Sequence, residues 1–257
     1  MKNDRKLNKR ENAEDFYGSF FTEHPYWSTP YPNPDEAARL GKIMLFLSFI
    51  SRSCSNSGRE NRILDIGCGR GWLTKLASAY GVCHGIDPAH RSIEYARKSY
   101  PELDFYNCDL SGFLRNSHFK AYDIVIASEI IEHVVDKREF VRDLAKCLVP
   151  NGHAIITSPR GEIFKKWQRL GYENQPIEEW LTEKQLCLLF QCQHFQPILH
   201  DRVYINLSKM SFLNRLCASR RLLELLAPLR LMWFLKGLQY AAGFYQSWWF
   251  RLGIRIR

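Results

Sequence analysis

The sequence predicts an α/β protein in which a mostly parallel sheet carries helices on both faces. Short apolar segments rich in Ile, Val and Leu alternate with amphipathic ones between residues 61 and 195. This alternation is typical of strand–helix–strand units, whose parallel strands are buried on both sides. Several of the apolar segments end in an acidic residue or a glycine turn. Because ligands bind at the carboxyl ends of the strands in such sheets, we expect a ligand site at that edge.

The chain begins with a charged arm, followed by an aromatic segment and a helix. Residues 1–15 are polar and predict a disordered basic arm, and residues 16–60 predict a lid and a helix. The lid is rich in aromatic residues and prolines, which disfavour regular helix or central strand. Tyr17, Tyr26 and Trp27 are candidates to close over a substrate or to pack on the core. Asp35 is predicted to cap the helix, which continues to about residue 52.

Residues 61–208 predict the core of the fold. Thr182 and Gln185 indicate a capping box at the start of a late helix that ends near residue 191. The segment after that helix supplies one or two closing strands. The predicted strands are 63–66, 82–86, 103–107, 124–127 and 154–157, the predicted helices are 73–80, 92–99 and 140–148, and the closing strands lie in 195–207.

Residues 209–257 form a basic, aromatic extension that we expect to be helical. From residue 203 onward, nine Lys and Arg residues face one acidic residue, which gives +8 of the net charge of +9. The longest uncharged run, 237–250, has 14 residues, fewer than the roughly 20 that span a bilayer. The leucines of the extension and the Trp248-Trp249-Phe250-Arg251 segment can lie in a membrane interface. The alternative is a helical cap that covers the sheet, with arginine stems packed along it.

The most informative segment is an apolar strand that ends in Asp65 and leads through a glycine turn into a helix. Gly67, Gly69 and Gly71 stand at alternate positions, where the absence of a Cβ lets the backbone approach a ligand. This spacing differs from the Gly-x-Gly-x-x-Gly of dinucleotide-binding turns. The Asp65 carboxylate disfavours a pyrophosphate and favours a cationic or hydroxyl-bearing ligand. Asp87 ends the next strand 22 positions later, close to the interval of a ribose-binding acid.

The segment Leu64-Asp65-Ile66-Gly67-Cys68-Gly69-x-Gly71 resembles the first motif of the S-adenosylmethionine-dependent methyltransferases with a Rossmann-like fold. Later landmarks follow in the order expected of that class, including the Pro150-Asn151-Gly152 turn. The resemblance covers about residues 61–195. It implies a Rossmann-like sheet of seven mostly parallel strands and S-adenosylmethionine as the cofactor. The cofactor-binding residues that it implies are Asp65, Gly67, Cys68, Gly69, Gly71, Asp87, Asp109, Leu110 and Ser128.

A second group of polar residues follows the fourth predicted strand. If residues 129–133 form a helical turn, Glu129, Glu132 and His133 face one way and can act in acid–base catalysis or bind a divalent metal. The Glu-x-x-Glu-His pattern resembles the ubiquinone-biosynthesis O-methyltransferases and the small-RNA 2′-O-methyltransferases, in which these side chains hold a metal. Those groups carry a further histidine where this chain has Gln175, a poor substitute for which Glu178 or Glu179 can compensate. We therefore favour a catalytic or positioning role for these residues and keep metal ligation as the alternative.

We accordingly expect an S-adenosylmethionine-dependent methyltransferase, and specifically an O-methyltransferase acting on a small or lipid-linked hydroxyl compound, a sugar or a phenol. The alternatives are an RNA 2′-O-methyltransferase and a non-catalytic binding protein with the same fold. Basic residues interleaved with bulky apolar ones disfavour a nucleic-acid partner. Eight scattered cysteines without a Cys-x-x-Cys pair, after a charged N-terminus, predict a reduced, cytoplasmic protein. If the extension contacts lipid, the protein lies at the inner face of the membrane.

Overall fold

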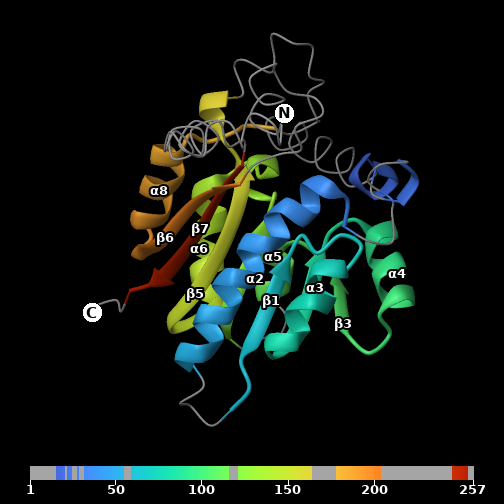
Figure 1. Ribbon diagram of the computed structural model, residues 1–257. Helices are drawn as coiled ribbons and strands as arrows, with labels where there is room; N and C mark the ends of the chain where they lie inside the picture. Colours follow the sequence, from blue (N-terminus) through green and yellow to red (C-terminus); the bar gives the residue numbers. More distant parts are fainter. Residues whose placement is uncertain are drawn as a thin grey trace, which may run out of the picture.

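A seven-stranded sheet forms the centre of the protein, with strand order β3-β2-β1-β4-β5-β7-β6 (Figure 1). The structure is a computed structural model that describes residues 16–20, 22–24, 28, 32–54, 59–115, 121–163, 178–203 and 245–253. Strands β1 to β5 run parallel to one another, and β7 is antiparallel to both β5 and β6. The strands are β1 Arg62–Ile66, β2 Val82–Asp87, β3 Asp104–Asn107, β4 Tyr122–Ser128, β5 Leu148–Pro159, β6 Phe195–Val203 and β7 Tyr245–Leu252.

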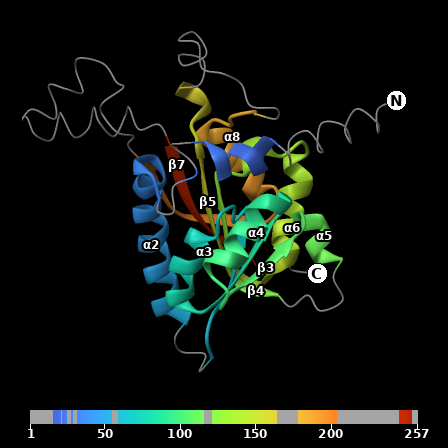
Figure 2. The same cartoon turned by 90° about the vertical axis from the view of Figure 1, so that its right-hand side faces the viewer.

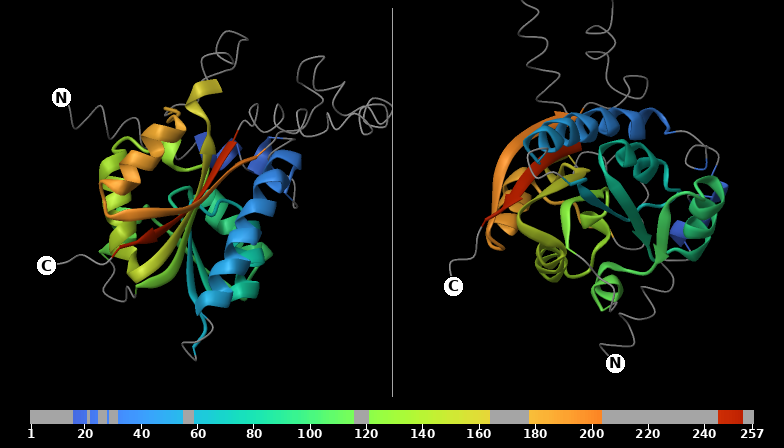
Figure 3. Two further views of the ribbon diagram at one scale, coloured as in Figure 1. Left: turned by 60° about the vertical axis from the view of Figure 1, so that its left-hand side comes forward. Right: turned by 90° about the horizontal axis from the view of Figure 1, so that it is seen from below.

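Helices cover both faces of the sheet, as the sequence predicts (Figures 2 and 3). Helices α2, α3 and α4 lie on one face, and α5, α6 and α8 lie on the other. A short 3-10 helix, η3, spans Ile131–His133 after β4. The helices are α2 Pro34–Cys54, α3 Trp72–Ala77, α4 His90–Ser99, α5 Leu110–Leu114, α6 Lys137–Cys147 and α8 Glu183–Gln191.

Neighbouring residues of each central strand contribute to different hydrophobic cores. Ile63 of β1 and Ile124 of β4 pack against α2 and α3, whereas Leu64 and Val125 pack toward the opposite helix layer. Successive side chains of a strand point to opposite faces, so a strand that is covered on both faces is apolar at most of its positions. The continuous apolar runs of the sequence therefore correspond to these strands, and the five predicted parallel strands are confirmed.

The cap of helix α2 lies two residues before the predicted one. Asn33, not Asp35, is the capping residue: its Oδ1 accepts a 2.9 Å hydrogen bond from the Glu36 N–H. The Asn33 N–H donates in return to Glu36 Oε2 at 2.8 Å, which completes a capping box. Pro34 occupies the first helical position, where its missing N–H leaves no intrahelical bond unmade.

The aromatic segment before α2 also differs from the prediction. Residues 16–20 are helical, although we expected no regular helix there. The prolines of this region begin at Pro25, so none of them interrupts this turn. Tyr26 and Trp27, the other two lid candidates, lie outside the described residues.

The predicted helical extension is wrong at its C-terminal end, because Tyr245–Leu252 is strand β7. This strand pairs with β5 and β6 and lies between them, so the core does not end at residue 208. Trp248 and Phe250 belong to the main core, 7% and 0% exposed, and Trp249 packs against the α2 side. Aromatic residues favour strands, and their alternation here covers two faces. These residues therefore cannot form a membrane-interface belt. Residues 209–244 and 254–257 of the extension lie outside the described residues.

Two further features bear on the predictions for the end of the chain. The capping box of Thr182 and Gln185 is confirmed at the start of α8. Among the helices that the structure describes, none combines the length and apolar character required to cross a bilayer.

Candidate functional site

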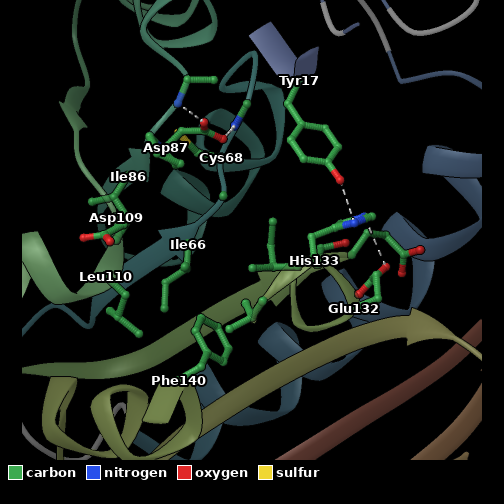
Figure 4. A pocket seen from close by; sticks show the side chains of 18 of the residues that line it. Tyr17, Ile66, Cys68, Ile86, Asp87, Asp109, Leu110, Glu132, His133 and Phe140 are labelled. Atoms are coloured by element: carbon green, nitrogen blue, oxygen red, sulfur yellow. Dashed lines mark hydrogen bonds and ion pairs between the residues drawn. The ribbon is translucent and has the colours of Figure 1, made fainter. Parts of the chain in front are cut away.

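A cavity of about 570 Å³ opens at the carboxyl edge of β1, β2 and β4, within the range of small-molecule pockets. Figure 4 shows Asp87 and Asp109 on one side of it and Tyr17, Glu132 and His133 on the other. The predicted site residues that line it are Asp65, Gly67, Cys68, Gly69, Asp87, Asp109, Leu110, Ser128, Glu129, Glu132 and His133.

The glycine turn between β1 and α3 adopts a backbone that L-residues rarely take. Gly67, Gly69 and Gly71 have φ angles of 71°, 49° and 79°. A Cβ on Gly67 would lie 2.6 Å from Cγ1 of Ile130, whereas a Cβ on Gly69 would meet no atom within 4 Å. Gly69 therefore presents bare backbone to open space. Gly71 does not line the cavity: it is needed for packing, because a Cβ there would lie 2.8 Å from Phe105.

Asp87, at the end of β2, is fixed by backbone donors from two loops. Its Oδ2 accepts a 2.9 Å hydrogen bond from the Gly69 N–H, and its Oδ1 accepts one of 2.8 Å from the Ala89 N–H. The carboxylate is thus held in one orientation beside the glycine turn. A carboxylate has about four lone-pair sites, so it can accept further hydrogen bonds from a ligand.

Asp65 lies deeper in the cavity and is 1% exposed. Its Oδ2 accepts a 2.7 Å hydrogen bond from Thr74 Oγ1 of α3. Burial raises the pKa of Asp65 to about 7, although the hydrogen bond from Thr74 partly opposes this shift. A neighbouring ion pair that was not expected from the sequence, between Arg70 and Glu36 at 2.6 Å, connects the glycine turn to α2.

Asp109 and Leu110 line the cavity on the same side as Asp87. Asp109 caps helix α5, and its Oδ1 accepts a 2.7 Å hydrogen bond from the Gly112 N–H and one of 3.0 Å from Ser111 Oγ. Leu110 is buried and contributes an apolar surface. The wall therefore offers a polar edge beside an apolar side chain.

A chain of hydroxyls connects Ser128 to Glu129 at the end of β4. Thr157 Oγ1 donates to Glu129 Oε1 at 2.9 Å and lies 2.8 Å from Ser128 Oγ. Glu129 has φ of 59°, and its N–H donates to the Thr157 carbonyl, so the helical turn expected over residues 129–133 is wrong at its first residue. The side chain of Glu129 thus extends toward β5 instead of sharing one helical face with its neighbours.

His133 and Glu132 stand at the opposite end of the cavity from Asp87. Nδ1 of His133 is 2.8 Å from the Tyr17 hydroxyl, and Nε2 is 3.9 Å from Oε1 of Glu132. Glu132 is 1% exposed, and burial raises its pKa to about 8. Of the three predicted lid residues, the structure thus places Tyr17 against the cavity.

The three predicted metal ligands do not form a metal site. Across the described residues, no three His, Cys, Asp or Glu side chains are arranged to hold a metal ion. Glu129 is directed at Thr157 and at Arg39, whose Nε lies 3.8 Å from its Oε1, while His133 is directed at Tyr17. A divalent ion needs oxygen or nitrogen atoms that converge at about 2.0–2.6 Å. The directions of the Glu129 and His133 side chains and the adjacent guanidinium therefore do not fit a resident metal. Gln175 lies outside the described residues.

Arg39 and Glu36 are site residues that the sequence analysis missed. Both are buried and line the cavity from α2. They continue the stripe of Ile43, Leu47 and Ile50 on the core side of that helix. A charge on the apolar face of an amphipathic helix was the available signal.

A family model described as a methyltransferase domain matches residues 36–200. The chain therefore belongs to this family of methyltransferase domains. It is 30% identical over 160 residues to a ubiquinone biosynthesis O-methyltransferase from Rickettsia conorii, covering 60% of this chain and 53% of that protein. It is 36% identical over 105 residues to the mitochondrial enzyme of the same name from Bos taurus, covering 38% and 28%. The match thus spans about a quarter to a half of these relatives.

Solved structures share the fold at low sequence identity. The N-methyltransferase NodS from Bradyrhizobium japonicum, in complex with S-adenosyl-L-homocysteine, has a TM-score of 0.62 at 16% identity, covering 94% of this chain and 98% of that one. The plantazolicin methyltransferase BpumL gives 0.58 at 18%, covering 97% and 99%. The [4+2]-cyclase SpnF gives 0.55 at 16%, covering 89% and 86%. The fold alone therefore does not specify the reaction.

Proposed function

We propose that this protein transfers a methyl group from S-adenosylmethionine to a hydroxyl of a phenolic precursor of a quinone. The observation that carries this proposal is that one cavity joins Asp87 and the glycine turn to His133 and Tyr17. The acceptor class follows the names of the relatives, which are ubiquinone biosynthesis O-methyltransferases. A phenol is one of the two acceptor classes that the sequence analysis expected.

The Asp87 side of the cavity suits a nucleoside that carries an amino acid. The Asp87 carboxylate, oriented by two N–H groups, can accept hydrogen bonds from both ribose hydroxyls. The exposed backbone of Gly69 allows the amino-acid part to approach closely. Asp109 and Leu110 offer a polar edge and an apolar face for adenine. When bound, S-adenosylmethionine supplies an electrophilic methyl group.

His133 is the residue that we assign to remove the hydroxyl proton of the acceptor. If Nδ1–H donates to the Tyr17 oxygen at 2.8 Å, then Nε2 is the basic nitrogen of the ring. Tyr17 thereby positions the imidazole, and this role requires the tautomer in which Nδ1 carries the proton. Transfer from a sulfonium is an in-line displacement, so holding the acceptor oxygen in line with the methyl group contributes much of the rate acceleration. Proton removal by a placed base contributes about 10²- to 10⁴-fold.

The test is a methyl-transfer assay with labelled S-adenosylmethionine and separate catechol, sugar and small-RNA acceptors. We expect methylation of the catechol and a loss of about 10²-fold or more in kcat for His133→Asn. His84→Asn is the matched control, because His84 also bonds a tyrosine, Tyr122, at 2.7 Å but does not line the cavity. Methylation of RNA or sugar alone would contradict the acceptor class. Full activity in His133→Asn would contradict the assigned base.

We further propose that the acceptor is lipid-linked and that residues 209–244 bind the membrane surface in which it lies. The support is the basic and leucine-rich sequence of that segment, not the strand β7 residues. Flotation of the full chain with anionic vesicles tests this proposal. Charge reversal at Arg220 and Arg221 should reduce flotation, and equal flotation of both proteins would contradict it.

A further inference from the structure

The buried guanidinium of Arg39 lies at the acceptor end of the cavity. Arg39 belongs to α2, its side chain is 8% exposed, and its Nε is 3.8 Å from Oε1 of Glu129. The helix that carries it is anchored nearby by the Glu36–Arg70 ion pair at 2.6 Å. A charge placed on the core side of a helix is costly to desolvate unless it faces opposite charge. The carboxylate of Glu129 opposes this cost for Arg39.

Three carboxylate side chains share this end of the cavity with Arg39. They are Glu129, Glu132 and Glu178. The positive charge of Arg39 lowers the pKa of both Glu129 and Glu132, against the larger effect of burial, which raises them. Because arginine does not lose its proton in proteins, this charge is permanent. Arg39 therefore supplies at this place the positive charge that a divalent ion supplies in metal-binding sites.

We propose that Arg39 replaces a divalent cation as the positive charge that holds Glu129 and Glu132 beside the acceptor, and that this protein works without metal. A metal ion bound to Glu129 would have to share that carboxylate with the guanidinium, and the two positive charges would repel each other. Glu129 is already an acceptor for Thr157 Oγ1 at 2.9 Å. Arg39 acts as a positioning residue, since it orients the carboxylates and takes no part in bond making.

The activity test of this proposal rests on the proposed function, whereas the metal-binding test does not. Binding of Mn²⁺ to the protein can be measured without any methyl acceptor. A failure of the methyl-transfer reaction would therefore leave the metal-binding result interpretable. The two conclusions can thus fail separately.

The experiment is calorimetric titration of the full-length protein with MnCl₂, for the wild type and Arg39→Met. We expect no saturable binding by the wild type at millimolar Mn²⁺ and 1:1 binding by Arg39→Met. Glu132→Gln in the Arg39→Met background should abolish that binding, which places the ion at the carboxylates. Arg59→Met is the matched control, because Arg59 forms an ion pair of 2.6 Å with Asp123 outside the cavity. This control should bind no Mn²⁺.

Activity gives a second readout. Methyl transfer by the wild type should be unchanged by EDTA and by added Mg²⁺, and Arg39→Lys should retain this metal independence. Saturable Mn²⁺ binding by the wild type that disappears in Glu132→Gln would overturn the proposal, as would loss of activity in EDTA with recovery in Mg²⁺. A folded Arg39→Met protein that binds no Mn²⁺ would also overturn it. If Arg39→Met does not fold, the wild-type titration alone decides.

Discussion

Alanine substitutions in the glycine turn should separate backbone strain from steric overlap. The turn offers a contrast, because Gly67 and Gly69 both have positive φ but differ in their surroundings. A Cβ at Gly67 would overlap the side chain of Ile130, and one at Gly69 would enter open space. Gly41, in the middle of α2, is the matched control, since it is exposed, has ordinary helical φ and has no atom within 4 Å of an added Cβ.

The expected free energies of unfolding follow from these environments. Left-handed φ costs an alanine about 1–2 kcal/mol, which is the whole effect at Gly69. At Gly67, overpacking adds about 1–3 kcal/mol, for a total of about 2–5 kcal/mol. Gly41→Ala should instead stabilise the protein by about 0.5–1 kcal/mol, because alanine is the better helix former. The predicted order of stability is Gly41→Ala, wild type, Gly69→Ala, Gly67→Ala.

Urea unfolding followed by circular dichroism gives these values, and binding of S-adenosylhomocysteine gives a second contrast. The Cβ of Gly69→Ala would lie where the ligand approaches, so we expect affinity to fall about tenfold or more while most of the stability is kept. If Gly67→Ala is no less stable than Gly69→Ala, the steric argument from Ile130 is refuted. If Gly69→Ala binds the ligand as the wild type does, that residue does not face the cofactor.

Three further predictions concern buried groups and the last strand. Burial raises the pKa of Glu132 to about 8 from an ordinary 4.5, so between these pH values the folded state holds a proton that the unfolded state has released. The free energy of unfolding should therefore fall as the pH rises through this window. Urea unfolding at pH 5.5 and 8 should show a smaller fall for Glu132→Gln than for the wild type, and an equal fall would contradict the shift. Thr74→Val should cost about 1–3 kcal/mol in urea unfolding, because it removes the donor to the buried Asp65, and a neutral effect would contradict that bond. A chain that ends at residue 208 should lose the cooperative thermal transition seen by circular dichroism, because it lacks β7 between β5 and β6, and a native-like transition would contradict this.

Much of the parallel half of the fold could be predicted because its signals are local. Strands β1 and β4 are largely apolar and are buried on both faces, and β1 and β2 lead directly into a polar or glycine turn. The turn at Gly67 and the acid at Asp87 lie on neighbouring strands, so their meeting follows from the strand order. The capping box of Thr182 and Gln185 is a four-residue pattern that predicts a helix start without tertiary information.

The remaining features depend on contacts between distant segments. Strand β7 has neighbours on both sides, and its aromatic run is equally compatible with an amphipathic helix until β5 and β6 are placed beside it. The positive φ of Glu129 is set by its N–H bond to the Thr157 carbonyl, 28 residues away along the chain. The place of Arg39 on the apolar face of α2 indicates that it is buried, but its partner Glu129 is known only once β4 is placed beside that helix.

The binding of S-adenosylhomocysteine to the wild type and to Asp87→Asn, measured by calorimetry, tests the account most directly. An asparagine presents one acceptor and one donor to the two N–H groups that now hold the carboxylate, and it removes the charge. A lost hydrogen bond to a charged group costs about 1.5–3 kcal/mol, so affinity should fall about 10- to 150-fold. Asp104→Asn is the control, because the side chain of Asp104 in β3 is exposed, and it should bind S-adenosylhomocysteine as the wild type does. Absence of binding by the wild type at millimolar ligand, or equal binding by Asp87→Asn, would contradict the account.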